Sequence, residues 1–225
     1  FLKLAGATAL VTTVAKVGSV HGQQTLPEQA LINIPYYPQE KEGYCGVAAT
    51  QMVLAYLNPQ QVPSQRELAE EMHTEERGAT WSYEIVKAFQ RRVYSATHVD
   101  TSLSIDKLRE LLSYEIPTIA SGAFVPLGNY SAHAVVVIGY DDRRNEMIYH
   151  DSRAGPNIHI DYSWFDSLWT NQKIEPGKRI GIVVPYKGST YIPEFPLGSV
   201  AAVGIPLALA YFVMKNYSRR RWRGV

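Results

Sequence analysis

Cysteine is the scarcest residue of this 225-residue chain, which contains only Cys45. A single cysteine excludes an intrachain disulfide and any zinc site built from cysteines alone. Charged residues are also few, at 19% of the chain, and the formal net charge of +1 gives no general indication of nucleic-acid binding. Internal repeats, a Walker phosphate loop and a GxGxxG motif are absent. The histidines and acidic residues lack the helical spacing of metal ligands, so we expect neither a metal nor a cofactor.

Apolar residues are common by contrast, at 46% of the chain. Residues 196–214 form a run of about 19 uncharged residues, close to the roughly 20 that cross a bilayer as a helix. Aromatic residues flank this run, and the basic segment 215–223 follows it. A buried core helix followed by a nucleic-acid-binding tail is the alternative, but the positive-inside rule explains this order better. We predict that residues 188–225 contain a transmembrane helix with a cytoplasmic basic tail, and that no nucleic acid binds.

The N-terminal residues 1–24 contain a short apolar stretch between Lys3 and Lys16. The segment FLKLAGATAL resembles the residues after the arginine pair of twin-arginine export signals, although the arginines are absent because the sequence starts at Phe1. We expect a truncated export signal or an N-terminal anchor. Together the two ends predict a protein of a prokaryotic plasma membrane that contacts the lipid bilayer. Its globular part is expected on the periplasmic or extracellular side.

Residues 25–187, between these ends, have the pattern of one mixed domain. Helical periodicity predicts a helix over 46–57, and Ser64, Thr80 and Ser104 are predicted to cap further helices, the last two over 81–92 and 105–115. β-Branched or alternating runs predict strands over 31–37, 117–121, 133–140, 146–152, 157–162 and 179–186. Helices first and strands afterwards indicate an α+β fold with helices packed on one antiparallel sheet.

Cys45 stands at the start of the helix predicted over 46–57. The backbone N–H groups and the dipole of a helix N-terminus lower the pKa of a thiol and favour the nucleophilic thiolate. Gly46 allows the main chain to approach a substrate carbonyl closely. Gln39, upstream on an extended or turning segment, can donate its side-chain amide to a developing oxyanion, with the N–H of Cys45 as a second donor.

A thiolate nucleophile needs a base, and His133 opens a strand that should be central and buried. Antiparallel pairing across the turn 141–145 brings the start of this strand to the end of the next one. His133 then lies beside His150, Asp151 or Ser152. Taken singly, His133 is explained as a satisfied core histidine and Asp151 as a turn-forming aspartate. Their combination with Cys45 and Gln39, in this order along the chain, favours catalysis.

The order of these segments resembles the bacteriocin-processing, double-glycine-leader cysteine peptidases, family 39 of the papain clan. The resemblance covers residues 31–186 and implies a papain-like cysteine-peptidase fold. It runs from an Ile-Pro-Tyr strand through the cysteine-led helix to the strand sequence SAHAVVVIGYDD, and then to the turn DSRAG and a short aromatic helix over 163–169. Two positions depart from the family, because Ala132 replaces the usual glycine before the histidine and Ser152 replaces the usual proline after the aspartate.

The resemblance implies a role for each of four residues. Cys45 is the nucleophile, His133 the general base, Asp151 the residue that orients the base, and Gln39 the oxyanion donor. The histidines that match no position of the family are interpreted as surface or packing residues; they are His21, His73, His98 and His159.

We therefore predict a membrane-anchored, outward-facing cysteine peptidase or amide hydrolase that acts on a peptide or protein through an acyl-thioester of Cys45. The loops 75–81 and 124–131 are predicted to line its specificity pocket. The alternative is a non-catalytic, peptidase-like accessory subunit of a larger membrane complex, with Gly198 and Gly204 packing on helices of other subunits. The complete set of four functional residues favours catalysis.

Overall fold

The computed structural model describes residues 25–124, 132–173 and 175–186. The predicted export signal, the predicted transmembrane helix with its tail and most of the loop 124–131 lie outside these residues. None of the helices within the described ranges combines the length and the apolar character that a membrane crossing requires. The elements are β1 (Gln29–Leu31), α1 (Cys45–Leu57), α2 (Gln65–Glu71), α3 (Thr74–Arg77), α4 (Ser82–Gln90), β2 (His98–Asp100), α5 (Ile105–Ser113), β3 (Thr118–Gly122), β4 (His133–Asp141), β5 (Glu146–Asp151), β6 (Gly155–Asp161), α6 (Tyr162–Thr170) and β7 (Ile180–Val183).

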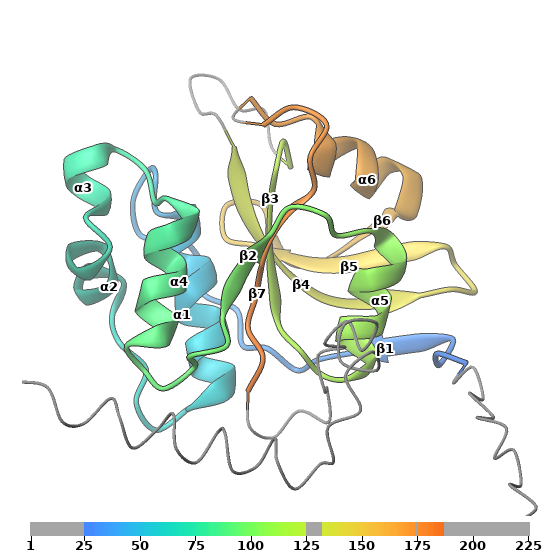
Figure 1. The fold of residues 1–225 in the computed structure, drawn as a ribbon, viewed down its shortest axis with the longest axis horizontal. Coiled ribbons are helices and arrows are strands. Elements are labelled where there is room, and N and C mark those ends of the chain that lie inside the picture. Colours follow the sequence, from blue (N-terminus) through green and yellow to red (C-terminus); the bar gives the residue numbers. More distant parts are fainter. Residues whose placement is uncertain (1–24, 125–131, 174, 187–225) are drawn as a thin grey trace, which may run out of the picture.

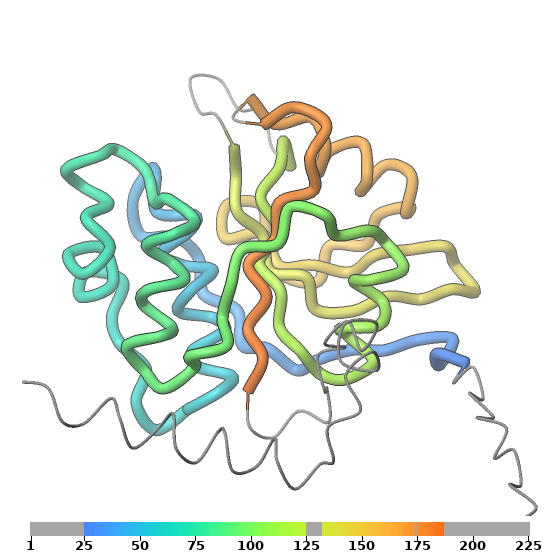
Figure 2. The backbone as a smooth tube through the Cα atoms, in the orientation of Figure 1, coloured from blue at the N-terminus to red at the C-terminus, as the bar shows by residue number. Residues whose placement is uncertain are grey.

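The chain forms a helical group and a sheet. Helices α1–α4 gather on one side, and the sheet with α5 and α6 lies on the other (Figure 1). The sheet of the described residues has the order β2-β7-β3-β4-β5-β6, with β1 paired to β4, and its strand pairs are antiparallel. The last strand, β7, returns between β2 and β3, which come much earlier in the chain (Figure 2). The predicted α+β class with an antiparallel sheet is confirmed.

Helix α1 lies at the boundary between the two groups. Its residues from Gly46 to Ala55 are all buried, and it packs against β4 as well as α2 and α4. Burial on every side suits the small and apolar residues that make up most of this helix. Its two buried polar side chains, Thr50 and Gln51, donate hydrogen bonds to carbonyl oxygens. The predicted helix is thus confirmed, and it begins one residue earlier than expected, with Cys45 as its first residue.

Strand β4 is the centre of the sheet. It pairs with β3 along its first half, with β1 near its end, and with β5 on its other side. From His133 to Tyr140 every residue is buried, as the run of valines and isoleucine predicts for a strand covered on both faces. A histidine at the first position of such a strand is therefore held inside the protein, close to α1.

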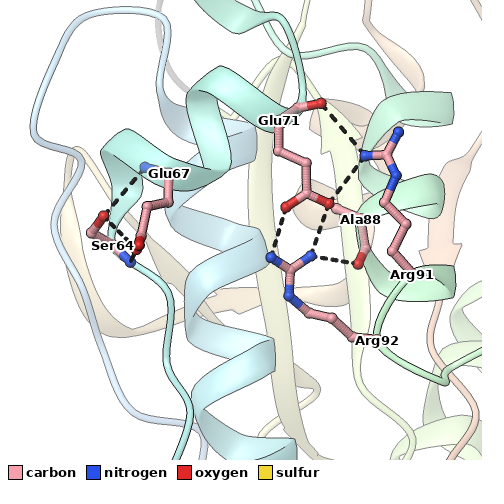
Figure 3. A network of polar contacts seen from close by, with 6 residues as sticks. All are labelled: Ser64, Glu67, Glu71, Ala88, Arg91 and Arg92. Atoms are coloured by element: carbon pink, nitrogen blue, oxygen red, sulfur yellow. Dashed lines mark hydrogen bonds and ion pairs between the residues drawn. The ribbon is translucent and has the colours of Figure 1, made fainter.

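Two predicted helix caps are confirmed, and one of them is seen in Figure 3. Ser64 and Glu67 form a capping box at α2, and Ser104 accepts a hydrogen bond from the N–H of Lys107 at α5. Figure 3 also shows Glu71 of α2 joined to two arginines that follow α4. These contacts hold the helical group together on the side of α1 away from β4.

Two details of the predicted elements are wrong. Thr80 does not cap α4, whose N-cap is Trp81 without a side-chain bond, because the hydroxyl of Thr80 pairs with that of Thr74 at 3.0 Å instead. The strand predicted over 31–37 ends at Leu31. The N–H of Ile32 still donates to the carbonyl oxygen of Ile138, but the N–H of Ile34 turns back to the carbonyl oxygen of Ile32 at 2.9 Å. Pro35 follows without an N–H group, so the ladder does not resume.

Candidate active site

His133 and Asp151 meet through the β4–β5 hairpin. The two strands pair antiparallel, with Val136 opposite His150, so that the start of β4 lies near the end of β5. His133 Nε2 lies 2.8 Å from Asp151 Oδ1, and the two residues are only 5% and 1% exposed. Of the three neighbours that the predicted hairpin allowed, Asp151 is the one hydrogen-bonded to His133.

His150 and Ser152, the other two neighbours, have different partners. His150 Nε2 lies 2.9 Å from the carbonyl oxygen of Ile34, and its Nδ1 accepts a hydrogen bond of 3.1 Å from the backbone N–H of Asn157. These bonds require a neutral ring with its proton on Nε2, and burial lowers the pKa of His150 accordingly. Ser152 Oγ donates to Gln39 Oε1 at 3.1 Å. His150 is therefore a structural residue, whereas Ser152 contacts another predicted site residue.

The carboxylate of Asp151 accepts three hydrogen bonds through Oδ1. Besides the ring of His133, the donors are the backbone N–H groups of Arg153 at 2.8 Å and of Ala154 at 3.2 Å. Burial alone raises the pKa of this carboxyl group, but His133 and the two backbone N–H groups lower it below its ordinary value. Asp151 therefore forms a local turn and also presents a negative charge to His133.

Cys45 lies on the other side of His133 and is partly exposed. Burial raises the pKa of its thiol, but the hydrogen bond and charge of His133, with the backbone N–H groups of Ala134 and Gly46, lower the pKa below its ordinary value. The N-cap residue Tyr44 makes no side-chain hydrogen bond to the helix. The N–H groups of the first turn can therefore stabilise an anion at this end of α1.

His133 connects the thiol to the carboxylate. Burial lowers the pKa of the ring, but hydrogen bonds to Asp151 and Cys45, together with their charges, raise the pKa to about 9. Since Nε2 faces Asp151, Nδ1 is the ring nitrogen left for Cys45. A thiol with a lowered pKa beside an imidazole with a raised pKa favours a thiolate–imidazolium pair at neutral pH.

Gln39 lies on the segment between β1 and α1. Its Nε2 donates to the carbonyl oxygen of Lys41 at 2.9 Å, and its Oε1 accepts from Ser152 Oγ. The backbone N–H of Gln39 also donates to the carbonyl oxygen of Ser152 at 3.0 Å. Because Ser152 directly follows Asp151, Gln39 is tied to the turn that carries the carboxylate. Gln39 is thus connected through Ser152 to Asp151, and through Asp151 to His133 and Cys45.

Gly46 contributes by packing. A Cβ atom added there would lie 2.7 Å from the Cβ of Thr80 and 3.2 Å from Ile85 Cδ1. A larger residue would therefore push Thr80 away from the start of α1. The segment 75–81, predicted as a loop that lines the specificity pocket, begins inside α3 and lies with its Thr80 against the helix end that carries Cys45.

Three residues near the cysteine were missed by the sequence analysis. The hydroxyl of Tyr44 donates to Glu75 Oε1 at 2.5 Å, and Lys41 Nζ lies 2.6 Å from the same oxygen. Glu75 thereby ties the chain just before Cys45 to α3. No local motif signals such a pairing, because its members lie 31 and 34 residues apart.

The remaining histidines lie away from this cluster. His73, His98 and His159 are exposed, in agreement with their interpretation as surface residues, and His21 lies outside the described residues. Across the ranges that the structure covers, no group of histidine, cysteine, aspartate and glutamate side chains could hold a metal ion.

The fold is similar to that of solved peptidase structures, whereas no curated protein matches the chain significantly. A double glycine motif protease from an AMS/PCAT transporter, in complex with the leader peptide, is 20% identical. It has a TM-score of 0.50 over 70% of this chain and 95% of that one.

Two further structures extend this likeness. A putative C39-like peptidase from Bacillus anthracis is 17% identical, with a TM-score of 0.53 over 72% of this chain and all 100% of that one. The digestive procathepsin L 3 of Tenebrio molitor larval midgut is 11% identical, with a TM-score of 0.50 over 74% of this chain and 72% of that one. At these identities the likeness shows the fold alone, and the fold is papain-like.

A family model gives the more specific result. The model described as "Peptidase_C39 like family" matches residues 31–174, which is more than half of the chain and contains the four predicted site residues. The chain therefore belongs to the Peptidase_C39 like family.

Proposed function

We propose that the chain is a cysteine peptidase or amide hydrolase that acts through an acyl-thioester of Cys45. The observation that carries this proposal is the continuous contact from Cys45 through His133 to Asp151 at the N-terminus of a buried helix. A structural module needs none of these three groups in this order, whereas a thiol nucleophile needs all of them.

In the proposed first step, the thiolate of Cys45 attacks the carbonyl carbon of the scissile amide. The negative charge moves to the carbonyl oxygen, where the backbone N–H of Cys45 and the side-chain N–H of Gln39 donate hydrogen bonds to it. His133, protonated at the start, gives its proton to the leaving amine as the C–N bond breaks. The acyl group is then held as a thioester, and the imidazole is neutral.

In the proposed second step, water attacks the thioester carbonyl while neutral His133 accepts a proton from it. The C–S bond breaks, the acyl group leaves as a carboxylic acid, and the thiolate and imidazolium are restored. Asp151 keeps the ring of His133 oriented and stabilises its positive charge in both steps, without itself taking the proton. No step requires a metal or a cofactor.

The proposed substrate is a peptide or protein. Membership of a peptidase family supports this substrate class, and the similar protease of the AMS/PCAT transporter is in complex with a leader peptide. The segment 75–81, packed against Gly46, lies where it can contact residues next to the scissile bond.

The proposal is tested with a p-nitrophenyl ester, which acylates a reactive thiol and needs no knowledge of the peptide sequence. We expect the full-length chain to release a burst of about one equivalent of p-nitrophenol and to carry the acyl group on Cys45 by mass spectrometry. Cys45→Ala should show neither. If the wild-type chain forms no thioester, or if Cys45→Ala releases p-nitrophenol equally, catalysis is rejected. The accessory-subunit alternative would then be favoured.

We also propose that residues 1–24 and 188–225 anchor the domain to the outer face of a prokaryotic plasma membrane. The uncharged run 196–214 with the basic residues after it supports this placement. The full chain should resist extraction from membranes by alkaline carbonate, and protease added to spheroplasts should digest its globular part. Release by carbonate, or protection of the domain in intact spheroplasts, would refute the proposed topology.

A further inference from the structure

The segment that carries Gln39 is fixed from the helical side by Gln65. Gln65 is only 1% exposed. Its Nε2 donates to the carbonyl oxygen of Pro38 at 2.7 Å, and its Oε1 accepts from the N–H of Glu40 at 2.9 Å. One side-chain amide thus pairs with the main chain on both sides of Gln39, as a neighbouring strand would. A second glutamine, Gln51 of α1, accepts from Gln65 at 3.1 Å and braces it.

The same segment is fixed from the sheet side by Ser152. Its carbonyl oxygen accepts the main-chain N–H of Gln39 at 3.0 Å. Its hydroxyl donates to Gln39 Oε1 at 3.1 Å, and Ser152 is 3% exposed. The main chain around Gln39 is therefore held by bonds that do not involve the serine hydroxyl. That hydroxyl acts only on the carboxamide group of the side chain.

The orientation of this carboxamide decides whether it can act on an oxyanion. Nε2 faces the carbonyl oxygen of Lys41, which can only accept, and Oε1 faces the hydroxyl of Ser152. One of the two hydrogens on Nε2 is used by Lys41, and no hydrogen bond within the described residues uses the other. Rotation of the amide by half a turn would present Oε1 to a negatively charged oxygen and would oppose catalysis.

We propose that Ser152 is a positioning residue, whose hydroxyl holds the Gln39 carboxamide so that its second N–H points toward the oxyanion. This inference rests on the proposed function, since it assigns Gln39 the oxyanion described there. It concerns a position at which the chain departs from the family that it resembles, where proline is usual. Proline has no hydroxyl, so the contact comes from this chain's own residue.

The test compares two reactions of Cys45. Acylation by a p-nitrophenyl ester develops an oxyanion, whereas alkylation by iodoacetamide displaces iodide at carbon and develops none. Ser152→Ala should lower the acylation rate constant about 10-fold, the effect of losing one hydrogen bond, with little change in KM for the ester. Alkylation should stay within about two-fold of wild type. Ser152→Thr, which keeps the hydroxyl, should restore most of the acylation rate.

A double-mutant cycle makes the test specific to Gln39. In a Gln39→Ala background, Ser152→Ala should cause no further loss of acylation, because the group that it orients is gone. Ser113→Ala, which removes a hydroxyl bonded within α5, is the matched control and should leave both reactions unchanged.

The outcomes separate this inference from the proposed function. If wild type forms the thioester but Ser152→Ala acylates at the wild-type rate, the inference is wrong. It is also wrong if the loss is equally large in the Gln39→Ala background, or if alkylation falls in parallel. Absence of any thioester in wild type would instead remove the proposed function on which the inference rests.

Discussion

His133→Ala is expected to lower the rate of Cys45 acylation by the p-nitrophenyl ester by about 10²- to 10⁴-fold. The substitution removes the group that lowers the pKa of the thiol, and with it most of the thiolate at neutral pH. Because p-nitrophenolate leaves without a proton, this loss measures the activation of the thiol and not the proton transfer to an amine. It also leaves Asp151 buried with a charge that no longer faces a cation. Burst kinetics with the p-nitrophenyl ester, followed by mass spectrometry of Cys45, measure this loss.

The matched control for this variant is His159→Ala. His159 is an exposed histidine on β6 that pairs with Glu146, at a distance of 2.9 Å. This control variant should acylate at a rate close to wild type. A loss below 10-fold in His133→Ala, in protein shown to be folded by its circular dichroism and melting temperature, would contradict the assigned role of His133.

The second large effect is expected for Gln39→Ala, which should lower acylation by about 10²- to 10³-fold, the range for removal of one oxyanion donor. Alkylation by iodoacetamide should change little, because the thiolate–imidazolium pair is formed without Gln39. The two rates are measured on the same preparation, so that a loss of folded protein would lower both together.

Gln61→Ala is the control for this prediction. Gln61 is an exposed glutamine in the turn after α1, at the helix end opposite Cys45, and its removal should affect neither reaction. Equal losses of acylation and alkylation in Gln39→Ala would show a general distortion of the site, and unchanged acylation would remove Gln39 from the proposed mechanism.

Much of the fold can be predicted from local patterns in the chain. The run after Cys45 predicts α1 because small and apolar residues continue over all faces of the helix, and the valines after His133 predict a buried strand. The predictions for Thr80 and for the strand 31–37 are wrong for a shared reason. In both places a competing interaction decides the structure: a hydroxyl pair with Thr74 in one, and a local bond from the N–H of Ile34 to the carbonyl oxygen of Ile32 in the other.

The candidate site was predictable only in part. The order of residues predicts that a hairpin brings His133 to the end of β5, but three neighbours fit that geometry equally well. The choice of Asp151 depends on twist and register, since the β4–β5 ladder shifts between Val137 and Gly139. The two bonds from Gln65 that brace the segment around Gln39 span 27 and 25 residues of sequence, and the tie between Tyr44 and Glu75 spans 31. Local sequence patterns carry no signal for such contacts.

The central claim is that Cys45 is a working nucleophile activated by His133. The most direct measurement is the rate of Cys45 alkylation by iodoacetamide across pH, in the intact chain and in His133→Ala. Because His133 lowers the pKa of Cys45 and carries its own proton up to about pH 9, wild-type labelling should stay fast well below the ordinary thiol pKa of about 8.5. In His133→Ala only burial and the backbone N–H groups remain, so labelling should become slow at neutral pH and rise in alkali. Slow wild-type labelling that rises only near the ordinary thiol pKa, and is unchanged in the variant, would contradict the account.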